Sequence, residues 1–158
     1  MRKVLVFFAL LCVPLVSYTQ KNKLPDPEAH FSALIVDNIK TSIDWYSTYL
    51  GFTVINERAL PDAGFKQANL KRGTILLELI ELDAAVSPKE AIPNYTAKTR
   101  VKGIFKIGFR ISAFNEWIHH LTKLNVEFHG SVVKSNESGK KMVIIKDPDS
   151  NRIQLFEK

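Results

Sequence analysis

KDPDSNRIQLFEK, residues 146–158, encodes a tight turn followed by a strand. Pro148 fixes its own φ for the turn, and Asp149 and Asn151 tolerate the tight backbone that the turn requires. The residues that follow alternate as in a strand, which puts Gln154 on the face opposite to the aliphatic residues. A polar residue on that face predicts that the closing strand borders a cavity as well as the core.

The closing strand is the last element of a repeated pattern. The chain reads twice as strand, helix and three strands, over residues 30–82 and 104–158, with a polar linker over 83–103. The expected elements are strand 30–39, a helix from Thr41 to Leu50 closed by Gly51, strands 52–59, 65–72 and 74–82, then strand 104–111, helix 114–124, strands 126–134 and 141–146, and the closing strand. This order predicts a single α+β domain of two tandem βαβββ modules, paired into a curved, cup-like mixed sheet with the helices outside.

Four polar residues occupy matching positions in the two copies. Glu78 and Gln154, in the last strands, are 76 residues apart, and so are His30 and Lys106 in the first strands. Because alternate residues of a strand face the same way, all four are predicted to point away from the helices, and Arg110 shares the face of Lys106. If the half-sheets curl into a trough, these residues meet on its floor.

Two stretches of the chain resemble a known family: HFSALIVDNIKTSIDWYSTYLGF, residues 30–52, and KDPDSNRIQLFE, residues 146–157. They are similar to the opening and closing motifs of the glyoxalase/bleomycin-resistance/dioxygenase proteins, the vicinal oxygen chelate superfamily. The resemblance implies a cavity formed by paired βαβββ modules. In metal-using members it implies a divalent ion, held by two His or Gln and two Glu from the first and last strands.

Half of that implied ligand set is present. His30 and Glu78 match it, whereas Lys106 stands in place of the second His or Gln and Gln154 in place of the second Glu. A protonated lysine has no lone pair, and at about 4 Å it would repel a divalent ion by roughly 8 kcal/mol. An amide oxygen is a weak ligand for Zn, Ni or Fe. We therefore expect no catalytic metal, and the alternative is Zn, Ni, Fe or Mn held by His30, Glu78 and a substitute ligand.

The same residues have a use without a metal. Lys106 and Glu78 could form an ion pair, with His30 and Gln154 hydrogen-bonded around it. Lys106 and Arg110 would also make the trough cationic, which favours a carboxylate or phosphate on its ligand. The predicted ligand-binding residues are His30, Glu78, Lys106, Arg110 and Gln154, and no catalytic residue is assigned.

Residues 1–19 have the layout of a secretory signal peptide. A positive start, Met1-Arg2-Lys3, precedes an apolar run over 4–16 that is too short to span a bilayer as a stable helix. We expect cleavage before Gln20, export to the periplasm or the extracellular space, and a polar lead-in over residues 20–29. The single cysteine, Cys12, would leave with the signal. A retained membrane anchor is the alternative.

The charge of the chain argues against a nucleic-acid-binding function. The net charge of +6 is scattered, unlike the dense basic patch of nucleic-acid-binding proteins. Three functions stay open: an exported protein that binds a small, anionic ligand without a metal, a metal-dependent lyase, dioxygenase or thiol transferase, and a non-catalytic dimerisation or interaction module. We favour the first, and a homodimer is compatible with each of them.

Overall fold

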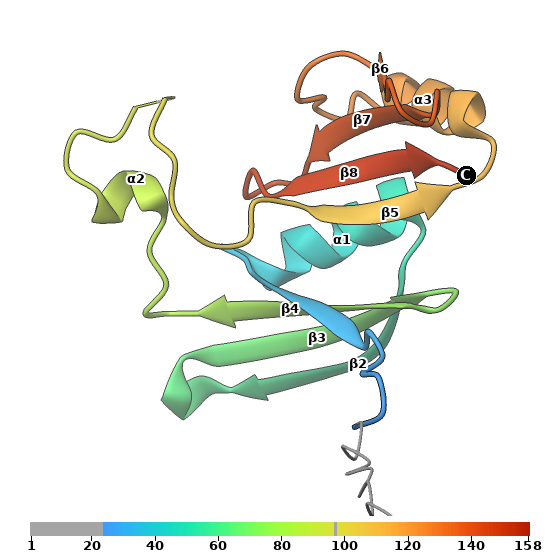
Figure 1. Cartoon of the computed structure of the whole chain (residues 1–158). Helices are drawn as coiled ribbons and strands as arrows, with labels where there is room; N and C mark the ends of the chain where they lie inside the picture. The colour runs from blue at the N-terminus through green and yellow to red at the C-terminus, as the bar shows by residue number, and fades with distance from the viewer. Residues whose placement is uncertain (1–23, 97) are drawn as a thin grey trace, which may run out of the picture.

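The elements follow one another in the order that the repeat predicts. The computed structural model describes residues 24–96 and 98–158, so the signal peptide predicted for residues 1–19 lies outside the described residues. The first module contains β1 (Phe31–Ile35), α1 (Ile39–Leu50), β2 (Thr53–Leu60), the 3-10 turn η1 (Pro61–Ala63), β3 (Phe65–Arg72) and β4 (Ile75–Leu82). A single helical turn, α2 (Pro88–Ala91), separates it from the second module, which contains β5 (Ile107–Ile111), α3 (Phe114–Lys123), β6 (Val133–Lys134), β7 (Lys141–Lys146) and β8 (Arg152–Glu157) (Figure 1).

Each module folds into its own four-stranded sheet. The strand orders are β1-β4-β3-β2 and β5-β8-β7-β6, and they match one another position by position. The first and last strands of each module run parallel, and their other neighbours run antiparallel. The predicted α+β class with helices on the outside is confirmed. Within the described residues the two sheets stay separate, since no strand pair joins them.

Local signals explain the bounds of the first helix. α1 begins at Ile39, slightly before the predicted start, because the side-chain oxygen of Asn38 accepts a hydrogen bond from Thr41 N (2.9 Å). It ends at Leu50, and Gly51 closes it in the left-handed region with φ 64°, as predicted. No helix in the described part of the chain is long and apolar enough to cross a membrane.

Some predicted strands are shorter in the structure. The strand expected over 126–134 is reduced to β6 and a bridge between Phe128 and Ile145, because Gly130, with φ 90°, interrupts the extended backbone. The strand expected over 104–111 begins only at Ile107. In its described residues, 83–96 and 98–103, the predicted linker carries α2 and is otherwise irregular.

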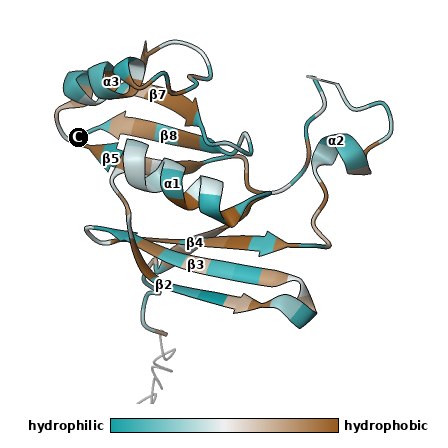
Figure 2. Ribbon diagram, turned by 180° about the vertical axis from the view of Figure 1, so that it is seen from behind, coloured by the Kyte–Doolittle hydropathy of each residue, from teal (hydrophilic) through white to brown (hydrophobic). Residues whose placement is uncertain are grey.

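The hydrophobic core lies between the helices and the inner faces of the sheets. β4 and β7 carry long hydrophobic runs (Figure 2), and the fully buried strand residues are Ala68, Leu70, Leu77, Leu79, Val143, Ile145, Ile153 and Leu155. Contacts between the modules extend this core. The Tyr46 hydroxyl donates to Asp147 Oδ2 (2.9 Å), and the Phe52 and Phe109 ring centroids are 6.0 Å apart. The faces of the sheets that point away from the helices, called the open faces below, carry the candidate site.

Candidate functional site

Strand pairing shows which residues of the two modules correspond. In the first sheet Ala33 of β1 is paired with Glu78 of β4. In the second sheet Gly108 of β5 is paired with Gln154 of β8. Glu78 and Gln154 therefore occupy equivalent positions, as predicted, and Ala33 is the counterpart of Gly108.

This register corrects the predicted counterpart of Lys106. Two residues before Ala33 and Gly108 lie Phe31 and Lys106, so Phe31, not His30, corresponds to Lys106. The error arises because the stretch from Gly108 to Gln154 is one residue longer than the equivalent stretch from Ala33 to Glu78. Since side chains alternate along a strand, Phe31 shares the open face of Glu78, and His30 lies just before the first residue of β1.

His30 and Glu78 nevertheless line the same pocket on the open face of the first sheet. This first-sheet pocket has a volume of about 290 Å³. Its walls are formed by His30, Phe31, Ile55, Asn56, Asn69, Leu70, Leu76, Leu77 and Glu78. The structure thus brings together two of the five predicted ligand-binding residues.

Two amide side chains, Asn56 and Asn69, line the first-sheet pocket, and a third, Gln67, contacts Glu78 beside it. Gln67 Nε2 donates to Glu78 Oε1, and Asn69 Nδ2 donates to Asn56 Oδ1 (2.7 Å). Glu78 is half-buried, so this hydrogen bond fixes its carboxylate within the open face. Sequence reasoning missed these three amides, although Gln67 and Asn69 alternate with apolar residues along β3. Together with the His30 imidazole, the pocket offers hydrogen-bonding groups beside an aromatic ring, and it contains no lysine or arginine.

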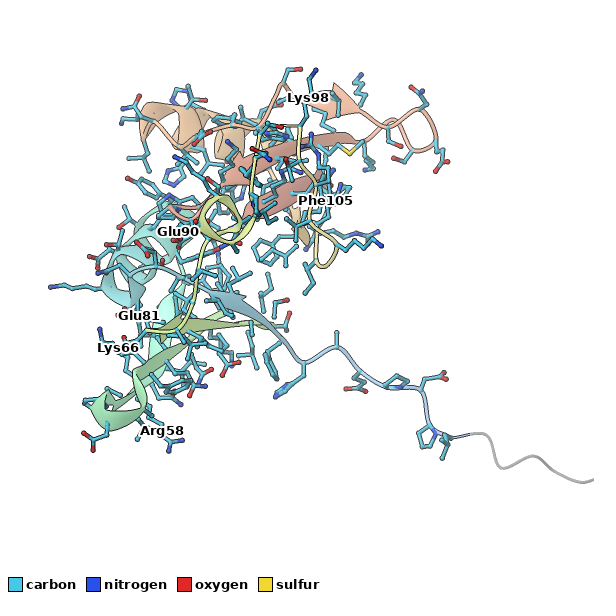
Figure 3. The ribbon with its side chains drawn as sticks, turned by 90° about the vertical axis from the view of Figure 1, so that its left-hand side faces the viewer. Arg58, Lys66, Glu81, Glu90, Lys98 and Phe105 are labelled. Atoms are coloured by element: carbon cyan, nitrogen blue, oxygen red, sulfur yellow. The ribbon has the colours of Figure 1, made fainter. Side chains whose placement is uncertain are left out.

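Lys106 lies apart from this pocket. It is exposed, and its Nζ is 6.0 Å from the centroid of the Phe105 ring. A second cation lies near the same ring, because the Arg152 guanidinium is 4.4 Å from its centroid. Figure 3 shows Phe105 next to the second sheet. The predicted ion pair between Lys106 and Glu78 is not formed in the part of the chain that the structure describes.

Gln154 is buried in the second sheet, with only 4 % of its surface exposed. Its Nε2 donates to Met142 Sδ (2.8 Å), and its Oε1 has no hydrogen-bond partner. An amide oxygen without a partner at this depth is costly. Arg110 does not line the first-sheet pocket. It borders a separate cavity where the modules meet.

The residues at the four equivalent positions do not fit the divalent metal that the family resemblance implies. By strand register they are Phe31, Glu78, Lys106 and Gln154, and a phenyl ring cannot coordinate a metal. No group of three His, Cys, Asp or Glu residues that could hold an ion occurs in residues 24–96 and 98–158. His30 and Glu78 supply two ligands, and structural or catalytic zinc sites take three or four from the protein.

The acidic residues of the closing motif join the modules. Asp147, 4 % exposed, accepts hydrogen bonds from the Tyr46 hydroxyl (2.9 Å), Asn151 N (2.8 Å), Asn151 Nδ2 (2.9 Å) and Asp149 N (3.0 Å). Asp149 in turn accepts from Asp37 N (3.0 Å) and Ser42 Oγ (3.3 Å). Burial raises the pKa of Asp147, and burial together with the Asp147 charge raises the pKa of Tyr46. This network holds the β7–β8 turn against α1 and lies outside the first-sheet pocket.

Comparison with known proteins agrees with this architecture. The sequence profile of the Glyoxalase/Bleomycin resistance protein/Dioxygenase superfamily matches residues 29–155. No curated protein is significantly similar in sequence to the chain.

Several solved structures share the fold. A glyoxalase family protein from Enterococcus faecalis is 25 % identical, with a TM-score of 0.70 over 82 % of this chain and 97 % of its own. The trypanothione-dependent glyoxalase I of Leishmania major is 21 % identical, with a TM-score of 0.61 over 84 % and 87 %. Lactoylglutathione lyase from Agrobacterium tumefaciens is 19 % identical, with a TM-score of 0.57 over 85 % and 96 %. At 21 % and 19 % identity the likeness to these two enzymes concerns the fold alone.

Proposed function

Because this chain belongs to the Glyoxalase/Bleomycin resistance protein/Dioxygenase superfamily, we propose that it binds a small organic molecule in the first-sheet pocket without a divalent metal. The observation that carries the proposal is the setting of Glu78. Its half-buried carboxylate is held by Gln67 on the open face of the sheet, in a pocket that also contains an imidazole, two amides and a phenyl ring. Small-molecule sites typically combine apolar walls with a few fixed polar groups in this way.

The lining of the pocket indicates the kind of ligand. Glu78 Oε2 and the Asn69 oxygen are acceptors without a partner among the described residues, so they favour a ligand that carries hydroxyl or N–H groups. Phe31 and Leu76 provide apolar surface for the rest of the molecule. The anionic ligand expected from Lys106 and Arg110 does not match this pocket, since neither residue lines it.

The absence of a metal is proposed from the chemistry of the donors. A divalent ion at the equivalent positions would meet one carboxylate, one amide, one ammonium and a phenyl ring. A lysine ammonium repels such an ion, and the amide oxygen adds little affinity for Zn, Ni or Fe. This argument depends only on which residues are present. It is therefore the same whether the two modules of one chain face each other or modules of two chains do.

Ligand binding can be tested by thermal shift and calorimetry with a panel of aromatic alcohols, amines and carboxylates. We expect an alcohol or amine to stabilise the chain, and Glu78→Gln to weaken its binding about tenfold through loss of a charge-assisted hydrogen bond. Glu137→Gln is the matched control, because Glu137 is exposed in the turn before β7. Binding that is unchanged in Glu78→Gln would contradict the proposal.

A divalent-metal enzyme is the second candidate, and one observation favours it: His30 and Glu78 line one pocket. A stoichiometric ion that is lost in both His30→Ala and Glu78→Gln would establish this candidate. The third candidate, an interaction module, draws on the exposure of Phe31 (58 %) and Ile35 (55 %) on the same face. A chain that binds no small molecule and is a stable homodimer would favour it.

Export is a separate part of the proposal and rests on residues 1–19 alone. Expression of the full chain in a Gram-negative host, followed by fractionation and N-terminal sequencing, tests it. We expect the periplasmic fraction to contain a chain that begins near Gln20. A full-length chain retained in the cytoplasm or held in the membrane would contradict export and leave the binding proposal intact.

A further inference from the structure

We propose that the cavity between the two modules is a second ligand site, which binds a small carboxylate or phosphate ester with an apolar body. This junction cavity has a volume of about 380 Å³ and shares no residue with the first-sheet pocket. Its walls come from the end of α1, the β3–β4 turn, β5, α3 and β8. The residues that the argument uses are Phe52, Arg72, Phe109 and Trp117.

Arg72 is a fixed cation in the wall of the junction cavity. One of its Nη1 hydrogens is donated to the carbonyl oxygen of Leu50, at the end of α1. The guanidinium lies over the Trp117 ring, 4.5 Å from its centroid, which is a cation–π distance. A guanidinium has five N–H donors, and no other acceptor for them is found among the described residues. Arg72 is therefore held in place with donors left for a ligand.

Arg110 and Lys158 also border the junction cavity, but Arg110 lies on the face of β5 opposite to Phe109, so Arg72 is the cation that faces the apolar walls. Arg110 is exposed and makes no ion pair or hydrogen bond in the described part of the chain. The main-chain oxygen of Lys158 accepts a hydrogen bond from Lys140 Nζ (2.6 Å). Among the described residues that line the cavity, none is Asp or Glu. An arginine with free donors and no Asp or Glu side chain beside it in the described lining of the cavity favours an anionic ligand, and a planar guanidinium matches the oxygens of a carboxylate or phosphate.

The apolar walls exclude a bare inorganic ion as the preferred ligand. The Phe52 and Phe109 rings are tilted at 48° with centroids 6.0 Å apart, and Trp117 is half-buried beside them. A ligand that buries a ring or alkyl group here gains the free energy of removing apolar surface from water, which inorganic phosphate cannot. The neighbouring cavity, which shares Arg72 and Trp117, contains Glu116 and is therefore less suited to an anion.

Titration of the chain with benzoate, phenyl phosphate, benzyl alcohol and inorganic phosphate, followed by NMR and calorimetry, tests this proposal. We expect benzoate or phenyl phosphate to shift the Trp117 indole signal. Benzyl alcohol and inorganic phosphate should each bind at least about tenfold more weakly, because each lacks one of the two required features. The better of the two anions identifies the head group.

Arg72→Gln is the informative variant, because it removes the charge and the planar donors that face the apolar walls. It should weaken benzoate or phenyl phosphate binding about tenfold, whereas Arg58→Gln, an exposed arginine of β2 outside the cavity, should leave it unchanged. Equal binding by Arg72→Gln and Arg58→Gln would overturn the proposal, as would benzyl alcohol or inorganic phosphate that binds as tightly. Shifts confined to the signals of His30 and Phe31 would place the anion in the first-sheet pocket and refute a second site.

Discussion

Removing the hydroxyl of Tyr46 should loosen the joint between the modules. The Tyr46 side chain is completely buried, and its hydroxyl donates to Asp147 Oδ2 at 2.9 Å across the module boundary. Tyr46→Phe keeps the ring and removes this charge-assisted hydrogen bond, which should cost about 2 kcal/mol. For a domain of this size that corresponds to a fall of roughly 6 °C in Tm. Urea unfolding at neutral pH measures the free energy directly.

The pH dependence distinguishes this mechanism from a simple packing defect. Burial raises the pKa of Asp147, and the bonds from Asn151 and Tyr46 oppose that rise. The pKa of Asp147 is higher in the folded chain than in the unfolded chain, so the ionised carboxylate is disfavoured in the folded state. Asp147 therefore contributes more to stability as the pH falls from its folded pKa toward its unfolded pKa. Tyr46→Phe removes a hydrogen bond that favours the ionised form of Asp147, so the cost of the substitution should shrink as Asp147 is protonated.

The control is Tyr49→Phe, since Tyr49 is half-buried and makes ring contact with Trp45. Equal losses in the two variants, or a Tyr46→Phe cost that is the same near pH 7 and near about pH 4, would refute the reasoning.

Two further substitutions test local electrostatics and polar burial. Glu81 accepts hydrogen bonds from Ile39 N (2.8 Å) and Lys66 Nζ (2.6 Å), which lower its pKa, so Glu81→Gln should cost about 1 kcal/mol at neutral pH. A carboxyl group with a lowered pKa contributes stability that is lost as the pH falls through that pKa. The difference in unfolding free energy between the original chain and Glu81→Gln, measured with urea, should therefore disappear in acid. A difference that stays constant would contradict this role of Glu81. Gln154→Leu removes the oxygen that has no partner and should leave Tm unchanged or raise stability by about 1 kcal/mol. A Tm that falls as far as in Tyr46→Phe would show that this oxygen is satisfied in solution.

The sequence predicts the module order well because its signals are local. Apolar spacing and Gly51 locate α1, and the turn residues of the closing motif locate the start of β8. The second module also shows a clean alternation, with Ile107, Phe109 and Ile111 on the inner face and Arg110 on the other. The orientation of β5 could therefore be predicted without any knowledge of its neighbours.

The orientation of β1 could not be predicted in the same way. Its sequence places large apolar residues on both faces, with Leu34 on one and Phe31 and Ile35 on the other. Alternation alone does not say which of these faces meets the helices, and only the pairing of Ala33 with Glu78 decides it. A difference of one residue between the modules was enough to exchange His30 for Phe31.

Contacts that depend on tertiary packing were beyond sequence reasoning. The predicted approach of Lys106 to Glu78 requires a particular arrangement of two separate sheets, which no local pattern encodes. The pairing of Asn56 with Asn69 across β2 and β3 depends on a register shift near Val54 that has no signal in the sequence. The first-sheet pocket was therefore predicted only through His30 and Glu78.

Metal binding by the purified full chain tests the central proposal most directly. Protein prepared without chelator should contain fewer than about 0.1 equivalents of Zn, Ni, Fe or Mn, and titration with each ion should give no saturable site. The donor set of Phe31, Glu78, Lys106 and Gln154 predicts this result. One tightly bound ion per chain, lost in Glu78→Gln and kept in Glu137→Gln, would contradict it.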